Sequence, residues 1–241
     1  MAELLRLDNL SKSFGSLRVT DDLSLRLGSD EALGIIGPNG AGKSTLFNLV
    51  TGSLKTDAGR VHFDGADITA LAPHERCRRG IGRSYQIPHP FAKMTVFENL
   101  LVAAAFAGGK PEAACYPHCV EVLSRTGLLA KANRPAGGLT LLERKRLELA
   151  RALATRPRLL LLDEIAGGLT EHECHDLVAT IRAIHAAGTA IIWIEHVVQA
   201  LLAVVGRLVV LDFGRLLAEG EPRRVMADPA VQDVYLGIGV A

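Results

Sequence analysis

A glycine-rich segment, GPNGAGKS at residues 37–44, restricts the fold of this chain more than any other feature. It matches the pattern GxxxxGK[ST], and it lies between the apolar run EALGII and residues 46–50, whose apolar spacing indicates a helix. A phosphate-binding loop requires this context, because glycines let backbone amides curl around phosphate oxygens and the helix start adds partial positive charge. Lys43 is placed to reach the β and γ phosphates, and Ser44 to ligate Mg²⁺. The alternative interpretation is an ordinary glycine-rich turn.

A second run, LLLLDE at residues 159–164, is the expected companion of such a loop. Four leucines predict a strand that is buried on both faces, so that Asp163 emerges at its carboxyl end, where parallel sheets bind ligands. Asp163 is placed there to hold Mg²⁺ through water, and Glu164 to orient or deprotonate an attacking water molecule. A solvated pair of acids at a strand end is the alternative.

The order of the remaining segments predicts a mixed α/β fold. After Pro157 strands and helices alternate, which implies a mostly parallel sheet flanked by helices. Before the glycine-rich segment, RLDNLSKSF and RVTDDLSLRL have the pattern of strands, whereas Pro73 to about Leu129 is mostly helical, with interruptions at GRSYQ and IPHPF. We therefore expect one domain, in which residues 1–72 and 157–241 form the core and residues 73–156 form a helical lobe.

Charge, hydropathy and cysteine usage exclude several classes of protein. Lys and Arg total 27 against 26 for Asp and Glu, a net charge of +1, which argues against a general nucleic-acid binder. No apolar run reaches the roughly 18 residues of a membrane span, and the N-terminus does not resemble a signal peptide, so we expect a cytosolic chain. Cys77, Cys115, Cys119 and Cys174 should then be reduced. The clusters CYPHC and HECH lack the CxxC pairing of zinc sites, and we expect no metal at either.

The segment LTLLERKRLELARAL, residues 139–153, predicts a capped amphipathic helix. Thr140 and Glu143 have the spacing of a capping box, which satisfies free backbone amides at a helix start. A helical wheel separates an apolar stripe from an opposite, charged face. The stripe holds Leu142, Leu149, Ala150 and Leu153, and the opposite face holds Arg144, Glu148 and Arg151. The electropositive start of this helix suits a phosphate ligand.

In this order the motifs resemble those of the ATP-binding cassette (ABC) family of transport ATPases, over essentially the whole chain. The resemblance implies a phosphate-loop NTPase fold of the α/β class, with a mostly parallel sheet core, an antiparallel β subdomain and a helical subdomain. It also implies that the ligands are ATP and Mg²⁺ and that the chain hydrolyses ATP. The residues that would hold the nucleotide are Gly37, Pro38, Asn39, Gly40, Ala41, Gly42, Lys43, Ser44 and Thr45.

Three further residues gain roles from this resemblance. Phe14, in SKSFGSL, stands where the family stacks an aromatic ring on adenine, although it could equally belong to the core. Gln86, in GRSYQIPHPF, matches the glutamine loop, which senses Mg²⁺ and the γ-phosphate and leads to the transmembrane partner. His196, in IIWIEHVV, matches the switch histidine that contacts the γ-phosphate, and residues 167–170 occupy the D-loop position.

The segment at residues 139–153 aligns with the family's signature, LSGGQ and its helix, which closes over ATP bound to the other subunit. Thr140 stands for the serine and would contact ATP in trans, but Leu141 and Leu142 replace both glycines and Glu143 replaces the glutamine. Either the backbone amide of Leu142 still faces the phosphate, or the added Cβ atoms block its close approach. We expect a working but weakened signature. Because closure is crossed, the weakness would affect ATP held by the partner.

Longer segments resemble the ATP-binding subunits of branched-chain amino-acid importers. They are GRSYQIPHPFAKMTVFENLLVA, RKRLELARALATRPRLLLLDEIAGGLT and the ending DPAVQDVYLG. This resemblance implies a second ABC ATPase subunit, identical or different, two transmembrane permeases and, indirectly, a substrate-binding protein, at the cytoplasmic face of the inner or plasma membrane. The apolar segment IPHPFAKMTVF would dock on the permeases, or else form part of the lobe's core.

Other members of the family provide the alternatives. Relatives of this kind serve urea, short amides and aromatic acids, and an ATPase of the lipopolysaccharide-export type is the nearest rival. An ATPase of DNA repair, chromosome maintenance or translation is disfavoured, because the chain holds one cassette with neither heptads nor CxxC pairs between Lys43 and Asp163. Glu164 argues against a regulatory subunit that binds ATP without hydrolysing it.

Overall fold

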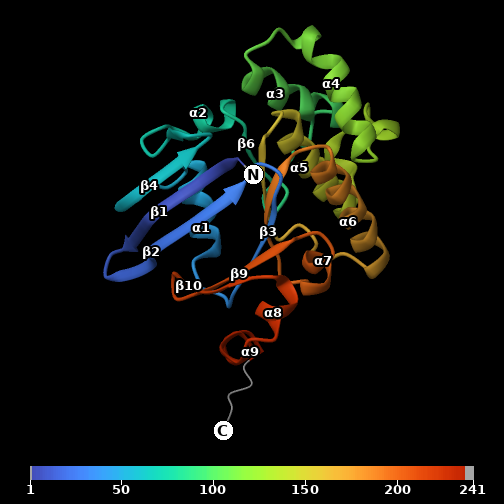
Figure 1. Cartoon of the computed structure of the whole chain (residues 1–241). Coiled ribbons are helices and arrows are strands. Elements are labelled where there is room, and N and C mark those ends of the chain that lie inside the picture. The colour runs from blue at the N-terminus through green and yellow to red at the C-terminus, as the bar shows by residue number, and fades with distance from the viewer. Residues whose placement is uncertain (1, 237–241) are drawn as a thin grey trace.

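A six-stranded sheet forms the centre of the computed structural model, which describes residues 2–236 (Figure 1). Its strand order is β10–β9–β3–β8–β7–β6. The strands are β3 (Ala32–Ile36), β6 (Ile81–Arg83), β7 (Leu159–Asp163), β8 (Ala190–Ile194), β9 (Arg207–Asp212) and β10 (Arg215–Gly220). All pair in parallel except β10, which is antiparallel to β9 at the edge. Every residue of β3, β7 and β8 is buried, as continuous apolar runs predict for strands covered on both faces.

A second, antiparallel sheet has the order β2–β1–β4–β5. Its strands are β1 (Glu3–Phe14), β2 (Leu17–Gly28), β4 (Ala58–Phe63) and β5 (Ala66–Asp67). Alternate residues of β2, namely Leu23, Leu25 and Leu27, are buried on one face. They share an apolar cluster with residues of β3 and of α1 (Lys43–Thr51). The segment between β3 and α1, which carries the phosphate-loop motif, is therefore anchored at both ends in this cluster.

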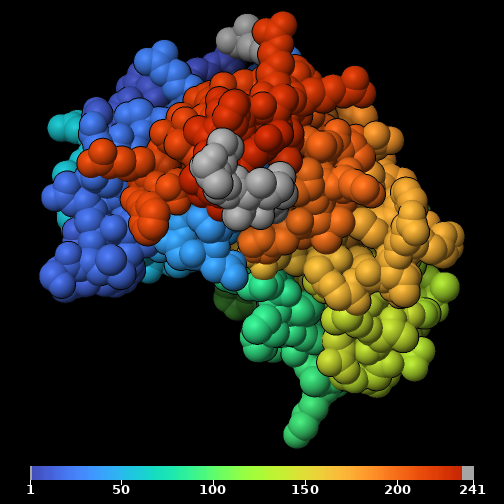
Figure 2. Space-filling model, turned by 90° about the horizontal axis from the view of Figure 1, so that it is seen from below, coloured from blue at the N-terminus to red at the C-terminus, as the bar shows by residue number. Residues whose placement is uncertain are grey.

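Helices cover the other side of the six-stranded sheet (Figure 1). α3 (Val96–Gly108), α4 (Glu112–Arg125), α5 (Leu141–Ala154) and α6 (Glu171–Ala186) pack in a second apolar cluster with residues of β7 and β8. The shorter helices are α2 (Pro73–Arg78), α7 (Val198–Leu202), α8 (Pro222–Met226) and α9 (Pro229–Leu236), and two 3₁₀ turns, Leu129–Lys131 and Ala136–Gly138, precede α5. Figure 2 shows the helical lobe, in green, standing away from the antiparallel sheet, in blue, with a hollow between them.

The predicted α/β class, with a mostly parallel sheet, an antiparallel sheet and a group of helices, is confirmed, but the lobe boundary differs. We expected residues 73–156 to lie outside the core, whereas β6 is a strand of the six-stranded sheet and pairs with β7. Three residues are too few to reveal the period of a strand, and they follow α2 closely. The chain therefore enters the helical lobe only after β6.

Helix α5 is buried on more sides than its sequence predicts. Leu142, which the wheel assigns to the inner stripe, is half-buried, whereas Lys145 and Glu148 are each only 5% exposed. The reason is that α5 packs against β6 and β7 and also against α3 and α4. The prediction that Glu148 lies on an outer charged face was therefore wrong.

Within residues 2–236, no helix combines the length and the apolar character that a membrane crossing needs. The C-terminal segment DPAVQDVYLG covers α9, and its final glycine lies outside the described residues.

Candidate functional site

The phosphate loop curls between the end of β3 and the start of α1, and its own lysine braces it. Lys43 is 6% exposed, and its Nζ donates hydrogen bonds to the carbonyl oxygens of Gly37 and Pro38, at 2.7 and 3.0 Å. Gly42, directly before α1, has a φ of 97°, and a Cβ atom there would lie 2.5 Å from the backbone oxygen of Val19. Only glycine therefore fits this position without displacing β2.

A hollow of about 180 Å³ lies over this loop. Residues 39–45 line it together with Val19 and Glu164. Ser44 and Thr45 lie in the first turn of α1, where backbone amides have no acceptor within the helix. The predicted loop residues are thus brought together, with Gly37 and Pro38 contributing carbonyl groups to the brace and the others lining the hollow.

The charge of Lys43 lies near both acids that follow the leucine run. Burial lowers the pKa of Lys43, and the carboxylates of Glu164 and Asp163 act against this shift. The ammonium group of Lys43 therefore lies close enough to the two carboxylates at the end of β7 to interact with their charge.

Asp163, the last residue of β7, is 5% exposed and has two unequal oxygens. Its Oδ2 accepts a hydrogen bond from Arg83 Nη2 at 2.7 Å. Its Oδ1 is buried and has no hydrogen-bond partner among residues 2–236. Buried polar atoms of native proteins nearly always have a hydrogen-bond partner, so this oxygen is available to accept a hydrogen bond from a ligand or from water.

Glu164 is the point at which three predicted catalytic side chains meet. Its backbone has a φ of 47°, and its N–H donates to the Ile194 oxygen of β8 at 2.9 Å. Its carboxylate accepts a hydrogen bond from Gln86 Nε2, and its Oε1 lies 2.9 Å from His196 Nε2. Residues that are distant in sequence are thus brought together around a carboxylate that borders the hollow.

These residues fit a nucleoside triphosphate and a hard cation. A hollow beside a glycine-rich turn, a helix start and a charged lysine has the donors that phosphate oxygens require. The unpaired Asp163 Oδ1 is of the ligand type that Mg²⁺ and its bound water prefer. Of the three predicted Mg²⁺ ligands, Ser44 lines the hollow itself. Gln86 is linked to the hollow through its hydrogen bond to Glu164, and Asp163 directly precedes Glu164 at the end of β7. By contrast, no cluster of three or more His, Cys, Asp or Glu side chains in the described part of the chain could itself hold a metal.

Two predicted nucleotide contacts, Phe14 and Thr140, belong neither to the loop nor to the lining of this hollow. Phe14 is 51% exposed, so the alternative that placed it in the core was wrong, and the Lys12 Nζ lies 5.9 Å from its ring centroid. Thr140 caps α5, as its capping box predicts: its hydroxyl accepts a hydrogen bond from the Glu143 N–H, and the Thr140 N–H donates to the Glu143 carboxylate at 2.9 Å. A role in adenine stacking for Phe14 and a role in trans for Thr140 stay predictions.

Sequence reasoning missed three charged residues that form hydrogen bonds to the predicted site residues. Arg83 binds Asp163, and Lys145 Nζ donates to the Glu164 backbone oxygen at 3.4 Å. Glu195 is 1% exposed and accepts the His196 N–H at 2.9 Å. Position was a usable signal for Glu195, which follows the apolar strand β8 at the edge where such sheets bind ligands. Arg83 had no such signal, because β6 is too short to be recognised from its sequence.

Known proteins resemble this chain over nearly its whole length. The family model described as "ABC transporter" matches residues 20–167, and the model described as "Branched-chain amino acid ATP-binding cassette transporter" matches residues 215–241. The probable branched-chain amino acid transport ATP-binding protein LivG of Methanocaldococcus jannaschii is 35% identical, over 98% of each chain. The lipopolysaccharide export system ATP-binding protein LptB of Haemophilus influenzae is also 35% identical, over 97% of each chain.

Solved structures of ATP-binding cassettes have the same fold. The ADP conformation of MJ1267, an ATP-binding cassette of an ABC transporter, superposes with a TM-score of 0.90 at 34% identity, covering 98% of this chain and 100% of that one. A nucleotide-free cassette from an ABC transporter gives a TM-score of 0.89, also at 34% identity, over 97% of this chain and 99% of that one. The chain belongs to the ABC transporter family: it is an ATP-hydrolysing subunit of a transporter, with the C-terminal region of branched-chain amino-acid cassettes.

Proposed function

We propose that this subunit powers the uptake of branched-chain amino acids, or of a related small polar or aromatic solute, through partner permeases. The observation that carries the proposal is the match of residues 215–241 to the branched-chain amino-acid cassette model, beyond the general ABC region. The likeness to LivG of M. jannaschii and to the branched-chain protein BraF of Pseudomonas aeruginosa supports it over the whole chain.

In the proposed reaction, Lys43 and the backbone amides of residues 39–45 bind the phosphates of ATP. Mg²⁺, when bound, neutralises charge on the β and γ phosphates. Ser44, Gln86 and the free oxygen of Asp163 are the groups that would hold it. Glu164 orients the attacking water and accepts its proton. The hydrogen-bond distance between Glu164 and His196 supports a shared role at the γ-phosphate.

The proposed assembly contains a second ABC ATPase subunit, two permeases and, indirectly, a substrate-binding protein, at the cytoplasmic face of the membrane. An apolar surface supports the docking of permeases next to Gln86. Tyr85 is 49% exposed, Ile87 is 65% exposed and Phe91 is 46% exposed, and all three lie in the segment between β6 and α3. Exposed apolar side chains that gather in this way are typical of protein interfaces.

Transport by a reconstituted complex tests the proposal. The tagged chain is purified from its native membrane, its permeases are identified, and the complex is placed in liposomes with the substrate-binding protein added and with ATP inside or outside. We expect leucine uptake that requires ATP on the side of this subunit and that Lys43→Ala abolishes. Uptake without ATP, or a complex that transports none of the branched-chain, amide or aromatic solutes, would contradict the proposal.

Export of lipopolysaccharide is the second candidate, because LptB of H. influenzae is as similar as the importer subunits. The same purification separates the two. Permeases that release labelled lipopolysaccharide from the membrane, in place of leucine uptake, would establish the exporter role and leave the ATPase mechanism unchanged.

A further inference from the structure

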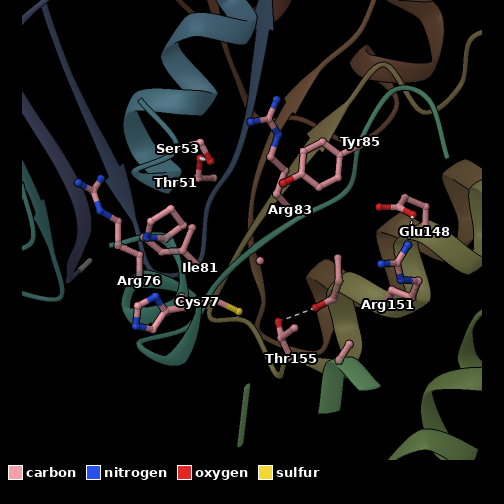
Figure 3. Close-up of a pocket in the computed structure, with 15 residues that line it drawn as sticks. Thr51, Ser53, Arg76, Cys77, Ile81, Arg83, Tyr85, Glu148, Arg151 and Thr155 are labelled. Atoms are coloured by element: carbon pink, nitrogen blue, oxygen red, sulfur yellow. Dashed lines mark hydrogen bonds and ion pairs between the residues drawn. The ribbon is translucent and has the colours of Figure 1, made fainter. Parts of the chain in front are cut away.

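Arg83, at the end of β6, joins this strand to α1 and to the end of β7. Figure 3 shows its side chain beside the ring of Tyr85. Its side chain is 7% exposed. Its Nη2 donates to Asp163 Oδ2 at 2.7 Å, and its Nη1 donates to Asn48 Oδ1 on α1 at 2.6 Å. The guanidinium carbon lies 5.4 Å from the ring centroid of Phe47 and 4.9 Å from that of Tyr85. Hydrogen bonds and aromatic faces thus hold the planar group in place.

The ion pair between Arg83 and Asp163 contributes little net free energy to the stability of the fold. Both side chains are only 7% exposed, and removing two charges from water costs about as much free energy as their attraction returns. A guanidinium that is held in this way can instead fix the orientation of the carboxylate that it binds, because its N–H donors lie in one rigid plane. We infer that Arg83 is a positioning residue, which fixes how the Asp163 carboxylate is presented to the cation.

The two oxygens of Asp163 carry this inference. Arg83 occupies Oδ2, whereas Oδ1 has no partner within residues 2–236 and is the atom that remains to accept metal-bound water. Without Arg83 the carboxylate could rotate, or could turn toward Lys43, whose charge already acts on it. The inference rests on the proposed function, in which Asp163 holds Mg²⁺.

A second contact connects this site to the exposed segment between β6 and α3 that we propose to dock on the permeases. Gln86 Nε2 donates to Glu164, so residues 83–86 are tied twice to residues 163–164. Tyr85 lies between the two ties, packs on the Arg83 guanidinium and is exposed (Figure 3). A partner that contacts Tyr85 would therefore touch a ring that packs directly on the residue that holds Asp163.

Nucleotide binding with and without Mg²⁺ tests this role. A non-hydrolysable ATP analogue is titrated by calorimetry into the full-length chain in EDTA and then in Mg²⁺, and bound Mn²⁺ is followed by electron paramagnetic resonance in a parallel series. For Arg83→Lys and Arg83→Met we expect unchanged affinity in EDTA, because the phosphate loop is untouched. The gain in affinity on adding Mg²⁺ should fall by about 10–100-fold, the usual effect of removing a group that orients a metal ligand.

Two further variants make the result decisive. Asn48→Ala removes the other anchor of Arg83 without leaving a buried charge and should reduce the Mg²⁺ gain in the same direction, so it decides the question if the Arg83 variants fail to fold in thermal melting. Arg158→Met breaks the surface pair of Arg158 with Asp64 and should change nothing.

The proposed function and the positioning role fail in distinguishable ways. If Asp163→Asn leaves the Mg²⁺ gain intact, Asp163 holds no cation, and the metal site and the inference fall together. If Asp163→Asn abolishes the gain while folded Arg83 variants keep it, only the positioning role is overturned.

Discussion

Alanine substitutions at three glycines with positive φ separate backbone strain, steric clash and loss of ligand contact. Gly40 and Gly42 lie in the phosphate loop, and Gly65 lies outside it. Gly42 has a φ of 97°, and its Cβ would lie 2.5 Å from the Val19 oxygen. Gly40, with a φ of 85°, and Gly65, with a φ of 75°, both have nothing within 4 Å of an added Cβ. Gly40 lines the hollow, whereas Gly65 lies in the turn between β4 and β5. Alanine therefore adds strain alone at Gly65, strain at the ligand site at Gly40, and strain with a backbone clash at Gly42.

The expected magnitudes follow from these differences. A left-handed conformation costs an alanine about 1–2 kcal/mol, and each kcal/mol lowers the melting temperature of a chain of this length by about 2–4 °C, so Gly65→Ala and Gly40→Ala should each melt about 2–8 °C lower. At Gly42 the clash adds the about 1–3 kcal/mol that overpacking costs. ATP affinity should be unchanged in Gly65→Ala and should fall about tenfold or more in Gly40→Ala, a loss of about 1.4 kcal/mol.

Differential scanning calorimetry and titration calorimetry on the same preparations measure both quantities. The reasoning is refuted if Gly40→Ala binds ATP as tightly as the unaltered chain, because the backbone then does not approach the phosphate. It is also refuted if Gly42→Ala melts no lower than Gly65→Ala, because the contact with Val19 would then be harmless.

Three further changes probe other parts of the site. Glu164→Gln should lower ATP turnover by roughly 10²–10⁴-fold while ATP stays bound in a closed dimer, and a normal rate of phosphate release would remove Glu164 from the mechanism. Leu142→Gly should raise the ATPase rate of the assembled complex, because it restores close approach at the start of α5; an unchanged or lower rate would show that the leucine is tolerated. Burial raises the pKa of the Cys119 thiol to about 11, above its ordinary value of 9.0, so at pH 8 the thiolate is scarcer in the folded than in the unfolded chain. Alkylation by iodoacetamide should therefore accelerate roughly a hundredfold or more in urea, and equal rates by mass spectrometry would contradict its burial.

Sequence patterns predicted correctly those segments whose structure depends only on residues close by in the sequence. The glycine-rich loop, the buried leucine strand and the helix caps depend on neighbours in sequence, and the structure has each of them where its pattern predicts. The helix Glu171–Ala186 likewise begins at a capping box formed by Thr170 and Glu173.

What sequence reasoning missed depends on packing between distant segments. Arg83 acquires its role from Asp163, which is 80 positions away, and no pattern around either residue indicates the other. Glu148 has the polarity of a surface residue, yet α3, α4 and the sheet surround its helix, and burial raises its pKa. The short strand β6 forms because it pairs with the edge of β7. Its three residues are too few to show this pairing in the sequence.

The contacts of Lys43 have a consequence for ligand entry. An ammonium group has three hydrogens, and the carbonyl groups of Gly37 and Pro38 already receive two of them, so a single donor remains for an incoming phosphate. The flexible stem is consequently immobilised before any ligand arrives, and the entropy of ordering it, up to about 2 kcal/mol for a lysine, is lost during folding and not during binding. The residue that we propose to contact the phosphates therefore also fixes the conformation of the loop before a ligand binds.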